Sequence, residues 1–179
     1  MAKNGLHLIT PTSIAYTGTS ASISANGSVS FSAVSTLSLN GVFTSDYDNY
    51  TVIWAGANST TDIPTYRLRS SGTDATGSNY VTQDLTATST TVSGTRTAAS
   101  TYGWYGYTST NKFGNTAFFY GPNLAQPTAV RLLSVNSRDG AYLQDDASTH
   151  SLSTSYDGFT VIAGAGSFTG RIAVYGMRK

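Results

Sequence analysis

The chain has 179 residues, contains no cysteine and no glutamate, and carries a formal net charge of only +1. The missing cysteines exclude disulfide bonds and thiolate metal sites, and the small charge indicates neither nucleic acid nor an anionic membrane as a partner. Charged residues make up 11% of the chain, compared with about a quarter in a typical soluble domain. This balance favours a neutral surface and extensive contact between subunits.

The composition is that of a β protein. Roughly three residues in ten are Ser or Thr, interleaved with Gly, Tyr and Val, whereas the charged and amide residues that favour helices are scarce. The length fits one domain with a real core. No stretch approaches the roughly eighteen apolar residues of a membrane span, and the first residues lack the apolar core of a secretory signal. We therefore expect synthesis in a cytoplasm and no membrane insertion.

Residues 1–18 are expected to form an N-terminal arm or edge strand, with the main domain spanning residues 19–179. Leu6, Leu8 and Ile9 belong to an apolar run that Pro11 ends. Because proline cannot donate a hydrogen bond to a central strand pair, this segment suits a sheet edge or an arm on a neighbouring copy. These three residues are therefore candidate interface residues.

From residue 29 onward, apolar residues alternate with polar ones. Val29, Phe31, Ala33, Leu37 and Leu39 share one face, and the following Asn-Gly pair marks a turn, the strongest short hairpin signal. Residues 50–54 are apolar on both faces, which suits a central strand. The spacing predicts about nine strands, near residues 29–39, 50–54, 66–70, 80–82, 102–107, 116–120, 129–135, 159–163 and 171–175.

The remaining segments predict turns and loops. The Ser/Thr tract that follows residue 82 and runs through Thr101 is expected to be a weak strand and a mobile loop. The glycine-rich residues 164–167 predict a tight hairpin between the last two strands. Short strands, turn chemistry and the lack of an amphipathic helix indicate a sandwich or a barrel. We expect an all-β, single-domain antiparallel jelly-roll sandwich.

Few residues can do chemistry. Asp46 and Asp48 flank a tyrosine in a pattern that can share a hard cation, although a polar turn before the strand at residue 50 is the simpler interpretation. Asp139, Asp145 and Asp146 form a second acidic patch, without the spacing or the Glu of an EF-hand calcium loop.

The two histidines lie far apart in sequence. We expect His7 to be packed or at an interface and His150 to be solvated in a polar loop. Without cysteine the chain cannot make a familiar structural zinc site, and no G-x-S-x-G nucleophile motif occurs. We expect no catalytic residue, no metal and no cofactor, so a small hydrolase is the least favoured class.

An aromatic cluster is the strongest candidate for binding. Alternation places Tyr105 and Tyr107 on one face of a strand, and Tyr102 and Trp104 on the other. One pair is expected in the core, and the other serves either as a contact between subunits or as a platform for carbohydrate.

Two arginines lie on the polar face of the strand predicted near residues 66–70. Arg67 and Arg69 alternate with Tyr66 and Leu68. They either bind acidic groups on a partner subunit or are simply solvated.

Four segments together resemble the small jelly-roll modules of tailed bacteriophages: FSAVSTLSLNGVF (31–43), DYDNYTVI (46–53), YRLRSSGTD (66–74) and FTGRIAVYGMRK (168–179). These modules serve as head decoration or cement proteins, tail components and receptor-binding tips, and are usually trimeric. The resemblance implies a virion surface protein without catalytic residues. The stretch to residue 18 is not part of the module's pattern.

The resulting expectation is a non-enzymatic homotrimer on the surface of a phage particle, made in the cytoplasm of the bacterial host. Because Met1 opens the chain and little precedes the β region, we expect a stand-alone product rather than a fibre tip. Capsid decoration is the favoured role, with the major capsid protein or another virion protein as partner. The alternative is a tail-associated protein that binds a host surface glycan.

Overall fold

The computed structural model describes residues 5–137 and 141–178. Within them the chain is all-β, with fourteen antiparallel strands and no helix. The strands are β1 (Leu6–Ile9), β2 (Ser13–Ile23), β3 (Val29–Asn40), β4 (Tyr47–Asn58), β5 (Thr65–Ser70), β6 (Thr73–Asp74), β7 (Tyr80–Thr88), β8 (Thr91–Ser100), β9 (Gly103–Trp104), β10 (Phe113–Tyr120), β11 (Thr128–Asn136), β12 (Tyr142–His150), β13 (Gly158–Ile162) and β14 (Phe168–Arg178).

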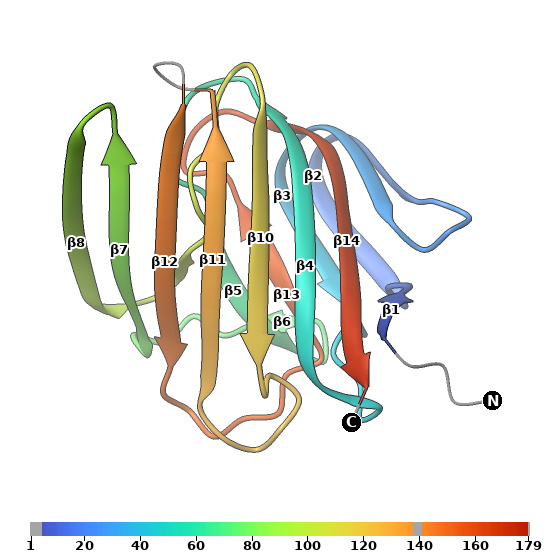
Figure 1. Ribbon diagram of the computed structural model, residues 1–179. Coiled ribbons are helices and arrows are strands. Elements are labelled where there is room, and N and C mark those ends of the chain that lie inside the picture. The colour runs from blue at the N-terminus through green and yellow to red at the C-terminus, as the bar shows by residue number, and fades with distance from the viewer. Residues whose placement is uncertain (1–4, 138–140, 179) are drawn as a thin grey trace.

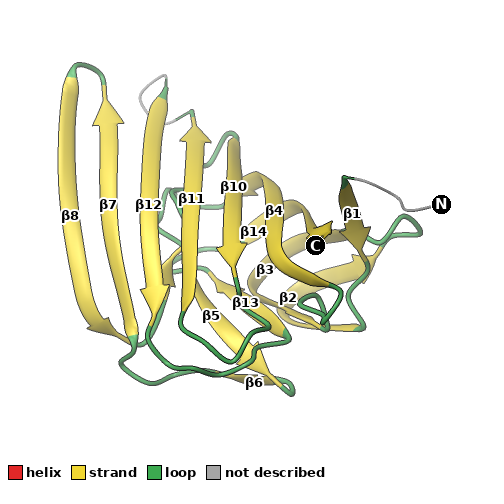
Figure 2. Ribbon diagram, turned by 60° about the horizontal axis from the view of Figure 1, so that its bottom comes forward, coloured by secondary structure: helices red, strands yellow, loops and turns green. Residues whose placement is uncertain are grey.

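The strands form one continuous sheet that curls into two layers (Figure 1). The front sheet contains β14, β4, β10, β11, β12, β7 and β8 in that order, and the back sheet contains β2, β3, β13, β5 and β6. The layers meet at β3, whose residues 29–34 pair with β14 and whose residues 36–39 pair with β13. Figure 2 shows that the β8 end of the front sheet extends beyond the back sheet. The fold is a single-domain sandwich of the jelly-roll-like type, which confirms the expected fold class.

A bulge in β3 makes this change of partner possible. Ala33 has a positive φ of 48° and shifts the alternation, so that Val34 takes the buried position expected for Ala33. Gly18 on β2 lies directly against the bulge, where a Cβ would be 2.1 Å from the Ala33 carbonyl oxygen. Only glycine fits so close an approach, and the bend lets one strand serve both layers.

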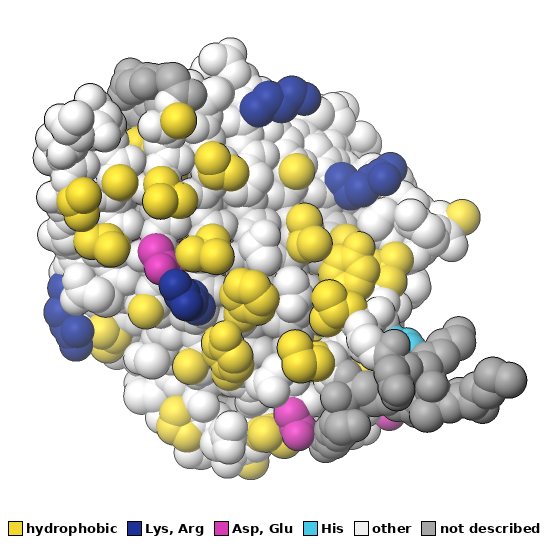
Figure 3. Space-filling model, in the orientation of Figure 1, with side chains coloured by type: hydrophobic (Ala, Val, Ile, Leu, Met, Phe, Trp, Pro, Cys, Tyr) yellow, Lys and Arg dark blue, Asp and Glu magenta, His cyan; other side chains and the backbone are white. Residues whose placement is uncertain are grey.

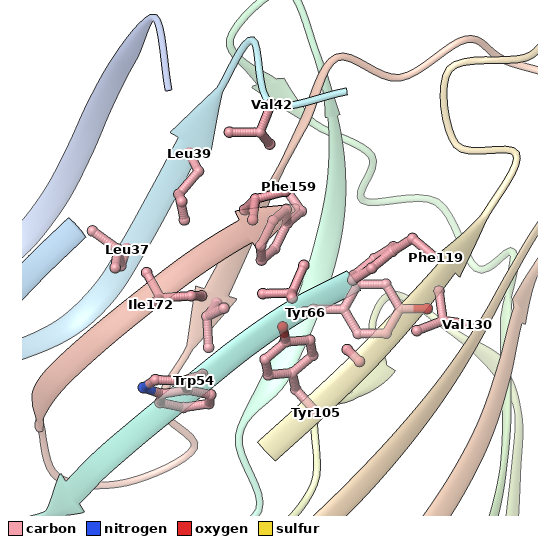
Figure 4. Packing of buried hydrophobic residues seen from close by; sticks show 14 of the residues in the cluster. Leu37, Leu39, Val42, Trp54, Tyr66, Tyr105, Phe119, Val130, Phe159 and Ile172 are labelled. Atoms are coloured by element: carbon pink, nitrogen blue, oxygen red, sulfur yellow. The ribbon is translucent and has the colours of Figure 1, made fainter. Parts of the chain in front are cut away.

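The core between the layers is rich in aromatic rings (Figure 4). Trp54 on β4 stacks on Tyr105 at 5.5 Å between ring centroids and meets Phe113 and Phe168 edge to face. Such pairs add stabilisation beyond the burial of area. The prediction that residues 50–54 form a central strand is correct, because β4 lies between β14 and β10.

Residues 101–112 close the β12 and β7 end of the sandwich. The inner faces of β7, β11 and β12 carry buried polar side chains there, and these bind the segment's backbone. The amides of Trp104, Gly106 and Tyr107 donate to Thr82 Oγ1, Asp146 Oδ2 and Ser134 Oγ respectively. The predicted strand at 102–107 is therefore reduced to the two residues of β9, because side chains rather than a neighbouring strand satisfy this backbone.

Three further expectations are wrong. The Ser/Thr tract forms the β7–β8 hairpin rather than a mobile loop. Residues 164–167 do not close a hairpin, because β13 and β14 each pair with β3 and not with each other. The turn at Asn40 and Gly41 joins strands that are not neighbours, so it does not form the expected hairpin.

The boundary proposed at residue 18 falls inside a strand, because the pairing of β2 with β3 runs from Ser13 to Ile23.

Candidate interaction surfaces

The outer face of the front sheet is a broad apolar surface (Figure 3). Among the described residues, thirteen large hydrophobic side chains are exposed, and nine of them lie on this face. On β4, β7, β10, β11, β12 and β14 these side chains alternate with buried or less exposed ones, so they point away from the core. Strand pairing places Leu6 on β1 and Val92 on β8 on the same side of the sheet. We call this surface the apolar face; its nine exposed members are Leu6, Ile53, Leu85, Val92, Tyr120, Leu133, Val135, Leu143 and Met177.

Cross-strand pairing gathers these side chains into neighbouring groups. Leu143 is opposite both Val135 on β11 and Ala87 on β7. Near the other edge, Met177 is opposite Leu6. Directly opposed side chains on one face are close enough to pack, so the groups form continuous apolar surface.

The apolar face also carries charge. The Arg131 guanidinium donates to both carboxylate oxygens of Asp145, at 3.1 and 2.7 Å, and the exposure of this ion pair limits what it adds to stability. Strand register places two further exposed arginines, Arg96 on β8 and Arg171 on β14, on the same side of the sheet. The face therefore combines exposed hydrophobic side chains with an ion pair and two further arginines.

The apolar face is large enough for a stable protein contact. The six intervals between the seven strands, at about 4.8 Å each, and the nine residues of β11, at about 3.4 Å each, give the whole sheet face an area of about 900 Å², polar and apolar positions together. A standard interface buries about 800 Å² on each partner. The face therefore has the dimensions of an interface.

The sequence carries a signal for this surface. In β11, Val130 and Leu132 are buried while Leu133 and Val135 are exposed, so the strand is apolar on both sides. The same holds for Ile53 in β4. These second apolar positions face outward, because no layer of the described chain covers them.

The three N-terminal candidates lie at the edge of the apolar face. β1 pairs with the end of β14, with Leu6 opposite Met177 and Leu8 opposite Tyr175. Leu6 is exposed, whereas Leu8 is half-buried and Ile9 packs against the core. The segment is thus an edge strand of its own chain, with Leu6 available for contact.

The aromatic candidates separate into two groups. Tyr105 is fully buried in the core, and Tyr107 is half-buried with its ring centroid 4.9 Å from that of Tyr142. Tyr102 and Trp104 instead line a hollow of about 370 Å³ on the outer side of the back sheet. Tyr105 is therefore not available for an intermolecular contact, whereas Tyr102 and Trp104 are.

The two arginine candidates also differ. Arg69 is buried, and its guanidinium binds Asp74, Thr160 Oγ1 at 2.8 Å and Ser38 Oγ at 3.1 Å. This network joins β5 to the strands beside it, so Arg69 is committed within the chain. Arg67 lies at the hollow, and among the described residues only its Nε has a hydrogen-bond partner, the Thr101 carbonyl oxygen at 3.1 Å.

Two carboxyl groups meet inside the fold. Asp84 and Asp146 are directly opposite on β7 and β12, and both are buried. Burial, together with the hydrogen bond and charge of Asp84, raises the pKa of Asp146 to about 8. Two buried like charges cannot both ionise readily, so the pair retains a proton. No local pattern indicates this pair, because its members are 62 residues apart in the chain.

The acidic patch predicted around Asp145 and Asp146 does not form. The two side chains point to opposite faces of β12, Asp145 outward to Arg131 and Asp146 inward to Asp84. Asp139 lies outside the described residues. Asp46 lies in the turn before β4, in agreement with the polar-turn interpretation. In the described ranges no group of three His, Cys, Asp or Glu could hold a metal ion.

The expectation for His150 is wrong. It is buried at the end of β12, where its ring lies 4.4 Å from that of Tyr80 and its Nδ1 is 3.2 Å from the hydroxyl of Tyr156. Burial lowers its pKa. His7 is half-buried, with its ring 6.1 Å from that of Tyr47, so it is partly packed as expected.

Comparison with known proteins adds no identity: no family model matches the sequence, and no relative is found among curated proteins. Over residues 5–137 and 141–178, no helix has the length and apolar character needed to cross a membrane.

Proposed function

We propose that this chain is a non-enzymatic structural protein of a tailed-phage virion, a homotrimer that decorates and stabilises the capsid. The apolar face is the observation that carries the proposal. The sheet face covers about 900 Å², the size of a standard interface, and its nine exposed hydrophobic side chains are costly to leave in water. It is suited to contact with sister copies and with the shell.

The segments that resemble phage modules support this role by their place in the fold. The segment 31–43 covers most of β3, and the segment 168–179 covers β14. These strands join the two layers, and β14 also forms one edge of the apolar face. The resemblance thus involves the centre of the sandwich as well as part of the proposed contact surface.

Stabilisation follows from binding that requires an assembled shell. Each copy meets several neighbours, so contacts that are weak one by one act together. A protein that binds the assembled shell and not its separated subunits shifts the equilibrium toward the shell. The host cytoplasm is the place of synthesis and the virion surface the place of action.

Heads from a phage that lacks this gene provide the test. Purified protein is expected to sediment with such heads and to raise the temperature at which they release their DNA. The double variant Leu133→Lys/Leu143→Lys places two charges on the apolar face and is expected to lose both effects. Leu152→Lys is the matched control, because Leu152 is similarly exposed but lies outside this face. Failure of the wild-type protein to bind heads, or equal binding by the double variant, would refute the proposal.

A further inference from the structure

The hollow beside β9 combines groups that do not otherwise occur together on the described surface. It is lined by Ile63 and Thr65 before and in β5, by Arg67, by Tyr102 and Trp104, and by residues 162–164 after β13. Its volume of about 370 Å³ lies in the range of small-ligand pockets, about 300–1,000 Å³. Thr65 and Arg67 alternate with the buried Tyr66, so the hollow opens on the side opposite the apolar face.

Rigid elements hold the aromatic side of the hollow in place. Trp104 is opposite Thr65 in the β9–β5 pair, and its amide donates to Thr82 Oγ1 at 3.3 Å. Gly103 lets β9 approach so closely that a Cβ there would lie 2.2 Å from the ring of Tyr66. The half-buried indole is therefore fixed by backbone contacts on both sides and presents a preformed apolar surface.

Arg67 supplies a directed positive charge at the same place. Its Nε donates to the carbonyl oxygen of Thr101, which fixes the guanidinium beside Tyr102. Neither Nη group has an acceptor among the described residues. A guanidinium with two such donors matches a carboxylate in a bidentate arrangement.

Thr65 adds a hydroxyl group to the hollow. It is opposite Trp104 in the β9–β5 pair and lies two residues before Arg67 on the same face of β5. The hollow therefore has a donor fork, a hydroxyl group and aromatic rings. A ligand with an apolar face, hydroxyl groups and an acidic group matches this lining.

We propose that this hollow binds an acidic sugar, a pyranose ring that carries a carboxylate. The C–H face of the ring packs on Trp104 and Tyr102, the carboxylate binds the Nη groups of Arg67, and a ring hydroxyl binds Thr65. Capsid decoration does not require this site, so the inference goes beyond the proposed function. The site also remains open when the apolar face is covered.

Tryptophan fluorescence provides the measurement, with trigalacturonate as the acidic probe and maltotriose as the neutral one. Trp54 is buried, so a saturable change reports Trp104. We expect trigalacturonate to bind in the millimolar range. Arg67→Gln is expected to weaken binding about tenfold through loss of charged hydrogen bonds, and Tyr102→Ala about fivefold through loss of aromatic contact. Arg171→Gln, a surface arginine on β14, is the matched control and is expected to bind as the wild type does.

Two outcomes would overturn the inference. One is the lack of a saturable signal with trigalacturonate in protein that is folded by circular dichroism. The other is undiminished affinity in Arg67→Gln. Equal affinity for maltotriose would overturn the assignment of an acidic ligand. None of these results depends on binding to heads, so the site and the proposed function are tested separately.

Discussion

The buried pair of Asp84 and Asp146 makes the stability of this protein depend on pH in an unusual direction. In the unfolded chain an aspartate releases its proton near pH 4, whereas in the folded protein burial beside Asp84 raises the pKa of Asp146 to about 8. Between these values the folded state holds one proton more than the unfolded state. The free energy of unfolding therefore falls as pH rises through this window.

The expected size follows from that one proton. The free energy of unfolding changes by at most about 1.4 kcal/mol per pH unit for each proton that differs. For a domain of this length, 1 kcal/mol shifts Tm by about 2–4 °C, so Tm is expected to fall by about 3–5 °C per pH unit. Both side chains are buried, so solvent does not screen their interaction. Asp146→Asn has no proton to lose and is expected to be more stable than the wild type above pH 8.

Thermal unfolding followed by near-ultraviolet circular dichroism between about pH 7 and pH 8.5 measures this slope; the lower limit lies above pH 6.5, where free histidine titrates. Burial lowers the pKa of His150, so folded His150 is neutral while the unfolded histidine is still partly protonated near pH 7. This contribution makes stability rise with pH, opposite in sign to that of Asp146. Asp146→Asn retains His150, so the difference between its slope and the wild-type slope isolates Asp146. Asp145→Asn is the control, because its side chain lies on the exposed face and is expected to keep the wild-type slope. A wild-type Tm that is constant or rises over this window, or an unchanged slope in Asp146→Asn, would show that the pair holds no proton.

Two substitutions test how the back sheet and β9 are held. Arg69→Ala leaves Asp74 without its buried partner and is expected to lower the free energy of unfolding in urea by about 3 kcal/mol. Arg131→Ala breaks an exposed ion pair and is expected to change this free energy little. Equal losses in the two variants would contradict the buried network. Gly103→Ala forces a Cβ against the ring of Tyr66 and is expected to cost about 1–3 kcal/mol. At Gly114 a Cβ would meet only Val135, at 3.8 Å, so Gly114→Ala is the matched control. If Gly103→Ala proves as stable as Gly114→Ala, that result would argue against the close approach of β9.

The strands could be predicted where alternation alone decides burial. β11 alternates strictly between buried and exposed positions, and its buried face includes Val130 and Leu132, so a period of two reveals this strand directly. β12 alternates in the same way, but most of its buried side chains are polar, and this is why residues 142–150 were not predicted to form a strand. β8 could not be recognised, because it is exposed on both faces and has no apolar alternation. Its structure depends on pairing with β7, which no local pattern encodes.

The candidate surfaces depended on contacts between distant segments. Arg67 and Trp104 meet only because β9 pairs with β5, and Asp84 meets Asp146 only through the register of β7 and β12. Arg67, Tyr102 and Trp104 were each candidates from the sequence, but the sequence did not indicate that they lie in one hollow. Which of two apolar faces is covered by a second layer is likewise decided by topology, so the alternation in β11 alone does not show that Leu133 faces outward.

The mass of the purified protein in solution tests the central claim most directly. If the apolar face joins copies of the chain, mass photometry and sedimentation equilibrium are expected to give a trimer, about three times the 18.8 kDa of the chain and within the usual range of small closed oligomers. The mass is expected to fall to that of one chain in Leu133→Lys/Leu143→Lys. A wild-type protein that sediments as a single 18.8 kDa species at high micromolar concentration would contradict the account.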